Sequence, residues 1–323
     1  MNLISIADEI KVSPIGLGTV NFGTGVSEED CFEQLDRYLD AGNLIDTAHV
    51  YGDWVPGERG RSERVIGKWL ASRRCRERVV ISTKGAHPRL THMDSPRVKP
   101  EEIRLDLEES LRCLQTDVID LYFLHRDDPT RPVGELLECL EDLRKAGRIR
   151  SYGCSNWRLP RMIEAARYAQ AHGLRGFVCN QLMWSLAAVN PAQVSDPTLV
   201  GMDAETYAYH RQSRMAAMAY MSIANGYFAH LARGDLKASV RLKYDQPINS
   251  VIYGRLRELS KAHDLSITQL SLLYFAAMPF PSVALASFSS IAQLEECAQL
   301  LQIPDRPEIY PELEGLRSDL LQG

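Results

Sequence analysis

Short apolar runs alternate along this chain with stretches of helical periodicity, and this alternation limits the possible folds more than any other feature of the sequence. Parallel strands need a crossover connection between them, so repeated strand–helix units predict a parallel sheet. Eight such units in 323 residues favour a closed barrel over an open, doubly wound sheet. The predicted strands are residues 15–20, 43–46, 79–84, 118–125, 150–155, 176–181, 215–220 and 282–286.

The helical stretches complete this pattern, with residues 222–246 predicted to be irregular. A short strand pair at 2–6 and 9–12 precedes the first unit and is placed to cover the N-terminal end of the barrel. We therefore predict one α/β domain over residues 1–323, a (β/α)8 TIM barrel with an N-terminal β-hairpin and long loops at its C-terminal mouth. The predicted helices are residues 28–41, 62–73, 100–114, 133–146, 159–172, 203–212, 247–263, 266–277 and 290–301.

Composition argues against several classes of partner. A net charge of −5 disfavours binding to nucleic acids or to anionic membrane surfaces. No apolar run approaches the roughly 18 residues that a membrane-spanning helix needs. The seven cysteines are odd in number and widely spaced, which is typical of buried thiols in a reducing compartment. We expect a cytoplasmic protein that acts on a small molecule.

The first predicted strand lacks the glycine-rich fingerprint of a Rossmann unit. Gly16 and Gly18 begin a Gly-x-Gly-x-x-Gly motif, but Asn21 stands where the third glycine belongs. A nicotinamide cofactor, if present, would therefore be bound without a Rossmann unit.

Ionisable residues gather where the predicted strands end, which is where barrel enzymes carry their catalytic groups. Asp46, Lys84 and His125 close three successive strands, and Tyr51 follows five residues after Asp46. A tyrosine has an ordinary pKa of about 10, which a neighbouring ammonium lowers. An aspartate would hold the lysine, and the histidine would orient a substrate oxygen. The set predicts a general acid for carbonyl reduction, or a general base for alcohol oxidation.

Each of these residues also has a purely structural interpretation. An aspartate at a strand end often caps a turn, and a buried Lys–Asp pair or a single histidine is often part of the core. Their joint occurrence at successive strand ends favours a catalytic site.

These residues lie within longer motifs that resemble the aldo-keto reductases. Residues 42–52 and 61–67 resemble the family signature Asp-Thr-Ala-x-x-Tyr-Gly…Ser-Glu, and residues 81–84 resemble its third strand. Residues 107–125 and 147–156 are similar to two further segments of the family. The resemblance runs from about residue 14 to residue 302, is strongest in the first 181 residues, and is to the bacterial branch that resembles potassium-channel β subunits.

This resemblance implies roles for individual residues. Those in the catalytic positions, with Tyr51 as the proton donor, are Asp46, Tyr51, Lys84 and His125. Those that would hydrogen-bond the nicotinamide carboxamide are Ser155, Asn156 and Gln181, and Tyr220 would stack on the ring. Those that would hold the pyrophosphate and adenosine half are Ser222, Ser289, Gln293 and Glu296.

The chain departs from the family pattern near the expected adenosine site. Ser287 and Gln293 stand where some members carry lysine and arginine, the cations that bind a 2′-phosphate. Arg233 and Lys237, in the stretch predicted to be irregular, are placed to supply that charge. We therefore favour NADP(H) over NAD(H) as the cofactor.

Two other functions and the substrate remain open at this point. One alternative is a cofactor-binding redox sensor or regulatory subunit with little turnover. The other is a metal-dependent enzyme that uses His49, His87 or His92. His87 and His92 lie in a proline-containing loop without a matching carboxylate cluster, and we expect no metal. The loop at 185–210 and the mouth residues that follow favour a polar substrate, such as a sugar or polyol: Trp54, Arg126, Asp127, Trp157, Trp184 and Tyr207.

Overall fold

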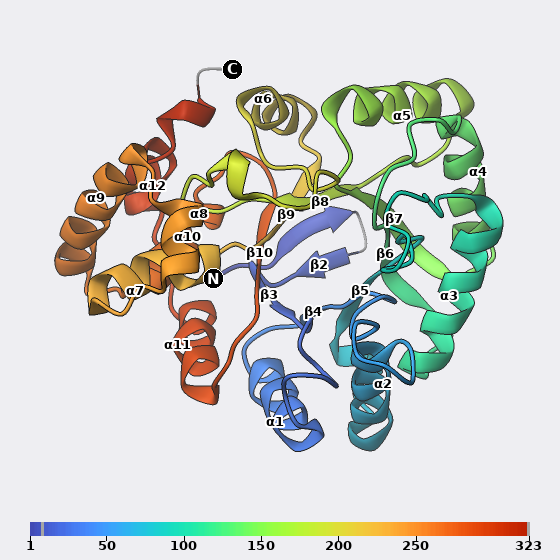
Figure 1. Ribbon diagram of the computed structural model, residues 1–323, viewed down its shortest axis with the longest axis horizontal. Coiled ribbons are helices and arrows are strands. Elements are labelled where there is room, and N and C mark those ends of the chain that lie inside the picture. The colour runs from blue at the N-terminus through green and yellow to red at the C-terminus, as the bar shows by residue number, and fades with distance from the viewer. Residues whose placement is uncertain (8–9, 322–323) are drawn as a thin grey trace.

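The computed structural model describes residues 1–7 and 10–321. Over these residues, eight parallel strands form a closed barrel, which confirms the predicted fold class. Figure 1 shows the helices arranged as a ring around it. In the order in which they pair around the barrel, the strands are β10 (Ser282–Ala286), β3 (Ile15–Gly18), β4 (Leu44–Asp46), β5 (Val80–Gly85), β6 (Ile119–Leu124), β7 (Ile149–Ser155), β8 (Cys179–Met183) and β9 (Ala216–Tyr220).

The predicted helices are present with ends shifted by at most a few residues. Four of them, α1, α6, α10 and α11, start at a side-chain cap; Ser266, for example, forms a reciprocal capping box with Gln269. These helices are α1 (Glu28–Leu39), α2 (Arg61–Arg73), α3 (Pro100–Leu114), α4 (Val133–Lys145), α5 (Leu159–His172), α6 (Ala204–Ser213), α9 (Pro247–His263), α10 (Ile267–Ala276) and α11 (Ile291–Gln302).

Three short helices were not predicted. Helices α7 (Tyr227–Arg233) and α8 (Ala238–Tyr244) form within the stretch expected to be irregular, and α12 (Tyr310–Gly315) follows α11. Helices this short are marginal on their own, so tertiary packing must stabilise them. The burial of Phe228 and Tyr244 supplies that packing.

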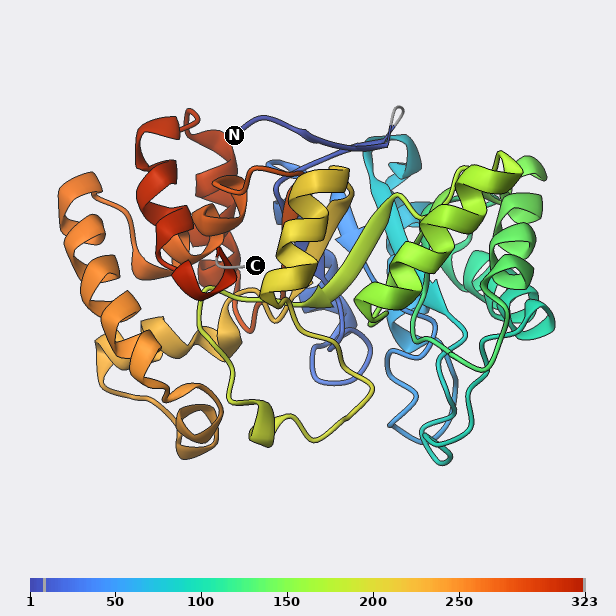
Figure 2. The same cartoon turned by 90° about the horizontal axis from the view of Figure 1, so that it is seen from above.

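The predicted N-terminal strand pair is confirmed as an antiparallel hairpin of β1 (Ile4–Ala7) and β2 (Ile10–Val12). Its apolar side chains pack against inward-facing residues of the barrel such as Leu121 and Phe123. The hairpin thus covers one end of the barrel. Figure 2 shows the long loops projecting on the opposite side.

The longest of these loops connects β8 to α6 and is tied to the rest of the chain. The amide of Asn190 donates to the carbonyl of Lys243 over 2.8 Å. The fully buried Asn249 of α9 accepts from the amide of Ala188 and donates to its carbonyl, both over 2.8 Å. These contacts hold the loop beside the C-terminal mouth of the barrel.

Two sequence expectations concern the whole chain. All seven cysteines are buried, as predicted. Within the part of the chain that the structure describes, no helix combines the length and hydropathy required to cross a bilayer.

The packing of α2 against α3 yields a test with a matched control. A Cβ at Gly67 of α2 would overlap the carbonyl oxygen of Cys113 and lie 2.9 Å from the Leu114 carbonyl carbon, whereas nothing lies within 4 Å at the exposed Gly254 of α9. We expect Gly67→Ala to lower the free energy of unfolding by about 1–3 kcal/mol through overpacking. Gly254→Ala should raise it by about 0.5–1 kcal/mol through helix propensity. Urea denaturation of both variants checks this, and equal effects would contradict the packing argument.

Candidate active site

The ends of three neighbouring strands bring the four predicted side chains together. Asp46 is the last residue of β4, Lys84 is near the end of β5, and His125 directly follows β6. Tyr51 lies in the turn after β4, where its amide donates to the carbonyl of Ala48. Asp46, Lys84 and His125 are buried, while Tyr51 is partly exposed. Three strand ends and the turn after β4 therefore place these groups at one mouth.

Lys84 occupies the centre of this group. Its Nζ donates to Asp46 Oδ2 over 2.7 Å, to the Thr47 carbonyl over 2.6 Å and to Tyr51 Oη over 3.3 Å. These bonds use the three donors of an ammonium group. A buried charge is tolerated when it is paired and hydrogen-bonded in this way.

Asp46 is equally well satisfied. Its second oxygen, Oδ1, accepts from Ser82 Oγ over 2.8 Å and from Gln181 Nε2 over 2.9 Å. Gln181 comes from β8, so this bond crosses the barrel interior. The carboxylate is thereby held in one orientation.

The pKa of Tyr51 reflects two opposing effects. Burial raises the pKa of Tyr51 above its ordinary value, and the Lys84 ammonium opposes this rise. The net direction is opposite to the lowering that the sequence suggested, because burial penalises the phenolate more than the ammonium stabilises it. Burial also works to lower the pKa of Lys84, but Asp46 and Tyr51 raise it above its usual value. At neutral pH the site thus holds a protonated phenol beside an ammonium.

His125 is held as a neutral ring. Burial, together with His87 and nearby cations, keeps the pKa of His125 well below its usual value. Its Nδ1 is buried and has no hydrogen-bond partner in the described part of the chain. The ring lies edge-on to Tyr51, with 6.1 Å between the ring centroids.

A cavity of about 220 Å³ opens at these residues. It is lined by groups from the ends of the barrel strands and from the long loop. Among the predicted site residues, the lining includes Asp46, Tyr51, His125, Arg126, Ser155, Asn156, Gln181 and Tyr220. Lys84 is not part of the lining and acts from behind Tyr51 and Asp46.

One wall of this cavity is a hydrogen-bonded group of polar side chains. Asn156 adopts a left-handed conformation with φ of 61°, which is uncommon outside glycine. Its Oδ1 accepts from Tyr220 Oη over 2.6 Å and from the Val200 amide over 3.1 Å. Its Nδ2 donates to Ser155 Oγ over 3.0 Å. Ser155, Asn156 and Tyr220 therefore form one preorganised surface.

A second cavity, of about 250 Å³, adjoins the first, and Ser287 lines both. Its lining includes Ser289, Gln293 and Glu296, three of the four residues expected around the adenosine half. Arg233 also lines it. The fourth expected residue, Ser222, lines neither cavity and donates to the Leu285 carbonyl over 2.7 Å.

Of the residues expected to contact substrate, Arg126 lines the central cavity and Trp54 does not. Arg126 lines the central cavity, where it donates to Thr198 Oγ1 over 2.8 Å and to Asp196 over 3.1 Å. Trp54 is 48% exposed and lines none of the described cavities around the mouth.

The expectation that Trp157 and Trp184 form platforms at the mouth is wrong. Both are buried in the hydrophobic core. Trp157 packs edge-on to Phe177, with centroids 4.9 Å apart, and Trp184 packs edge-on to Phe275 at 5.0 Å. Both follow strand ends in the sequence, but Trp157 packs on the segment before β8 and Trp184 packs on α10.

Several lining residues were not predicted, because they carry no ionisable group. All of them except Leu199 lie within two residues of the C-terminal end of a strand. They are Gly18, Thr19, Val20, Leu199, Met221 and Leu285.

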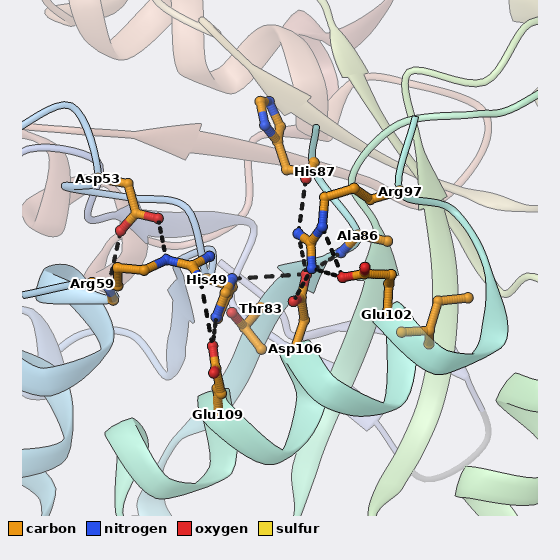
Figure 3. Close-up of polar contacts among 12 residues, drawn as sticks. His49, Asp53, Arg59, Thr83, Ala86, His87, Arg97, Glu102, Asp106 and Glu109 are labelled. Atoms are coloured by element: carbon orange, nitrogen blue, oxygen red, sulfur yellow. Dashed lines mark hydrogen bonds and ion pairs between the residues drawn. The ribbon is translucent and has the colours of Figure 1, made fainter. Parts of the chain in front are cut away.

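A separate polar network lies behind the loops that follow β4 and β5 (Figure 3). One ligand-type atom from each of His49, Asp106 and Glu109 lies within 4.8 Å of the others. These groups already bind one another or neighbouring cations: His49 Nε2 donates to Glu109 over 2.7 Å, and Asp106 accepts from Arg97 over 2.7 Å. Each of these groups therefore already has a partner within the protein.

Fold and site together define a class of protein, a (β/α)8 barrel whose mouth combines a protonated tyrosine, a buried Lys–Asp pair and a neutral histidine. The model of the Aldo/keto reductase family matches residues 14–317. The chain therefore belongs to this family of oxidoreductases, which use nicotinamide cofactors.

Individual relatives agree with this assignment. Norsolorinic acid reductase B of Aspergillus parasiticus is 36% identical over 199 residues, which cover 57% of this chain and 50% of that relative. The chain thus spans about half the length of the first curated relatives it matches. Aldo-keto reductase YhdN of Bacillus subtilis is 27% identical over 99% of this chain and 96% of its own length.

Among solved structures, the chain is similar to the thermostable aldo-keto reductase Tm1743 in complex with the inhibitor epalrestat. The TM-score is 0.70 with 22% sequence identity, over 98% of this chain and 100% of the other. This likeness supports the barrel fold.

Because Lys84 and Asp46 are hydrogen-bonded to each other in the barrel interior, we expect removal of Lys84 alone to destabilise the protein more than removal of both charges. Lys84→Met would leave Asp46 buried without its counter-charge and should lower the free energy of unfolding by about 3–5 kcal/mol. Adding Asp46→Asn removes the stranded charge and keeps an acceptor for Ser82, so the double variant should recover much of that loss. Chemical denaturation of both variants measures this. A double variant less stable than Lys84→Met would contradict the proposed pairing.

Proposed function

We propose that this protein is an NAD(P)(H)-dependent oxidoreductase that transfers a hydride between nicotinamide and a small carbonyl or alcohol, such as an aldehyde, sugar or polyol. The observation that carries this proposal is the position of Lys84 Nζ, 2.7 Å from Asp46 Oδ2 and 3.3 Å from Tyr51 Oη, behind the two residues that line the cavity. This arrangement couples a proton donor to a fixed positive charge.

In carbonyl reduction, Tyr51 is the general acid. Its pKa is raised by burial, so the hydroxyl carries a proton at neutral pH. The neutral His125 donates a hydrogen bond to the substrate oxygen and aims it at Tyr51. When the proton leaves Tyr51, the Lys84 ammonium stabilises the phenolate, and Asp46 keeps that ammonium in place. In alcohol oxidation the same groups act in reverse.

The polar residues of the cavity suit a nicotinamide carboxamide. Ser155 Oγ accepts from Asn156, which leaves its own proton for a ligand carbonyl, and Gln181 donates to Asp46 through Nε2, which leaves Oε1 as an acceptor. Tyr220 offers the aromatic face beside them. A bound nicotinamide supplies or accepts the hydride. Ser289, Gln293 and Glu296 suit the adenosine half in the second cavity.

We also propose that the substrate is polar. With Trp157 and Trp184 in the core, the support for this proposal comes from Arg126, which retains an exposed edge in the cavity beside its partners Asp196 and Thr198. Hydrogen-bonding groups of this kind favour a hydroxylated aldehyde or a sugar over a long alkyl chain.

The proton-transfer role predicts a specific loss of turnover. Tyr51→Phe should lower kcat for carbonyl reduction by at least about a hundredfold, while nicotinamide affinity changes little. Tyr253→Phe, on α9 away from the cavity lining, is the matched control and should retain activity. Steady-state kinetics with a panel of aldehydes and aldoses measures both. A Tyr51→Phe protein with most of its turnover would refute the assignment, and a wild-type protein that binds cofactor without turnover would favour a redox sensor.

The lining of the second cavity favours NADP(H) as the cofactor. Arg233 lines it and Lys237 does not, so Arg233 is the cation available for a ribose 2′-phosphate. Arg233 also contacts the exposed Asp235 over 3.3 Å and would share its donors with the phosphate. We expect tighter binding of NADPH than of NADH.

Arg233→Ala should weaken NADPH binding by about ten- to a hundredfold, the usual effect of losing a charged hydrogen bond, and leave NADH binding nearly unchanged. Lys237→Ala is the control and should have little effect on either. Parallel titrations of the two cofactors measure this. Tighter binding of NADH by the wild-type protein would show that the serine-rich pocket recognises a free 2′-hydroxyl instead.

A further inference from the structure

The chain turns sharply where β5 ends, at Ala86. This residue is fully buried and has a φ of 59°, in the left-handed region that residues with a side chain rarely adopt. Its amide donates to Asp106 Oδ2 over 2.8 Å. A strained conformation of this kind persists only when the surrounding structure holds it, and such positions cluster at functional sites.

Arg97 holds this turn from the other side. All five N–H groups of its guanidinium are engaged: two bind Glu102, two bind Asp106 over 3.1 and 2.7 Å, and one binds the carbonyl of His87 over 3.0 Å. Figure 3 shows Arg97 between the two carboxylates and the backbone of His87. We call Arg97, Glu102 and Asp106 the arginine clamp. The clamp binds the amide of Ala86 through Asp106 and the carbonyl of His87 through Arg97, and so fixes the backbone that carries the His87 side chain.

The His87 ring points away from the clamp and towards the active site. It packs edge-on against the His125 ring, with 4.7 Å between centroids and 62° between planes. Its Nδ1 lies 2.6 Å from the Pro88 carbonyl, so Nδ1 carries the proton and donates. The ring is therefore fixed by its own backbone bond as well as by the clamp.

The His87 ring covers one side of the His125 ring. His125 Nδ1 is buried and has no hydrogen-bond partner among the described residues. Since no acceptor is present at Nδ1, the single proton of the neutral ring is better placed on Nε2. The ring lines the central cavity, so Nε2 is the nitrogen that donates to a substrate there.

We propose that His87 is a positioning residue for His125. The arginine clamp holds the His87 ring, which fixes the plane of the His125 ring and excludes water from its Nδ1. As a result, the neutral His125 ring presents its Nε2–H to the substrate oxygen. This inference rests on the proposed role of His125 in carbonyl reduction.

The charges around His125 agree with this role. From the loop after β5, His87 remains uncharged, because burial and nearby arginines lower its pKa to about 4. Lys84 of β5, Arg126 beside the ring and His49 after β4 all disfavour a proton on His125, and Tyr51 after β4 carries no charge when protonated. If His87 were removed, water would reach Nδ1 and the pKa of His125 would rise towards its ordinary value. A new ionisation would then appear in the acidic range as the pH falls.

Three variants test this proposal. His87→Ala opens the space beside Nδ1 to water, His87→Phe keeps an aromatic ring there, and His87→Asn places an amide acceptor next to Nδ1. The first readout is the tautomer and titration of His125 in the cofactor-free protein, followed by NMR of labelled imidazole nitrogens from about pH 5 to pH 8, where histidine ordinarily ionises. The second is the pH dependence of kcat and KM for aldehyde reduction.

We expect wild-type protein and His87→Phe to keep the proton on Nε2 and to show no His125 ionisation in this range. His87→Ala and His87→Asn should move proton density to Nδ1, and both should lower kcat by about tenfold or more, as for loss of one oriented donor. His87→Ala should also add the new ionisation. Cofactor affinity should stay constant. If His87→Ala does not fold, His87→Asn provides the tautomer test.

A wild-type tautomer and kcat in both His87→Ala and His87→Asn would overturn the proposal, as would a His87→Phe protein impaired as strongly as the others. Failure of the proposed function looks different. The wild-type protein would then reduce no carbonyl, while the NMR readout would still decide whether His87 sets the state of His125.

Discussion

The structure of the site depends on one buried ion pair, Lys84 with Asp46. Neither charge is tolerable in the barrel interior without full hydrogen bonding, because burial of an isolated charge is prohibitively costly. The pair is satisfied by groups from different strands: Ser82 from β5, Gln181 from β8 and the Thr47 carbonyl after β4. The requirement to satisfy two charges therefore ties opposite sides of the barrel together and places the only remaining ammonium donor against Tyr51.

Two kinds of residue then surround the tyrosine. Lys84 lies against the Tyr51 hydroxyl and is held there by Asp46, so its positive charge would stabilise a Tyr51 phenolate. His125 lies edge-on to Tyr51. In our proposal, the position of its ring proton depends on His87, which packs against the His125 ring. The loops after β4 and β5 thus do more than connect elements. Arg97, in the loop after β5, forms salt bridges with Glu102 and Asp106 of α3 and binds the carbonyl of His87, and so fixes the backbone next to the ring that packs on His125.

The sequence was sufficient to predict the barrel and the convergence of Asp46, Tyr51, Lys84 and His125, because strand ends in a closed parallel barrel must meet at one mouth. It was insufficient for Trp157 and Trp184, since proximity to a strand end does not determine which way a side chain turns, and both pack into the core. Helices α7 and α8 escaped prediction because packing, not propensity, stabilises them. Burial raises the pKa of Tyr51, and the extent of burial does not follow from knowing which charged residues are its neighbours.

The central claim is that the cavity beside Tyr51 brings a carbonyl carbon to a nicotinamide for direct hydride transfer. The most direct test is to reduce a small hydroxylated aldehyde with a cofactor that carries deuterium at the reactive carbon of the nicotinamide, and to locate the deuterium in the product by NMR. The account predicts deuterium on the carbinol carbon and a solvent-derived proton on the oxygen. Consumption of the aldehyde with no deuterium on that carbon would contradict it.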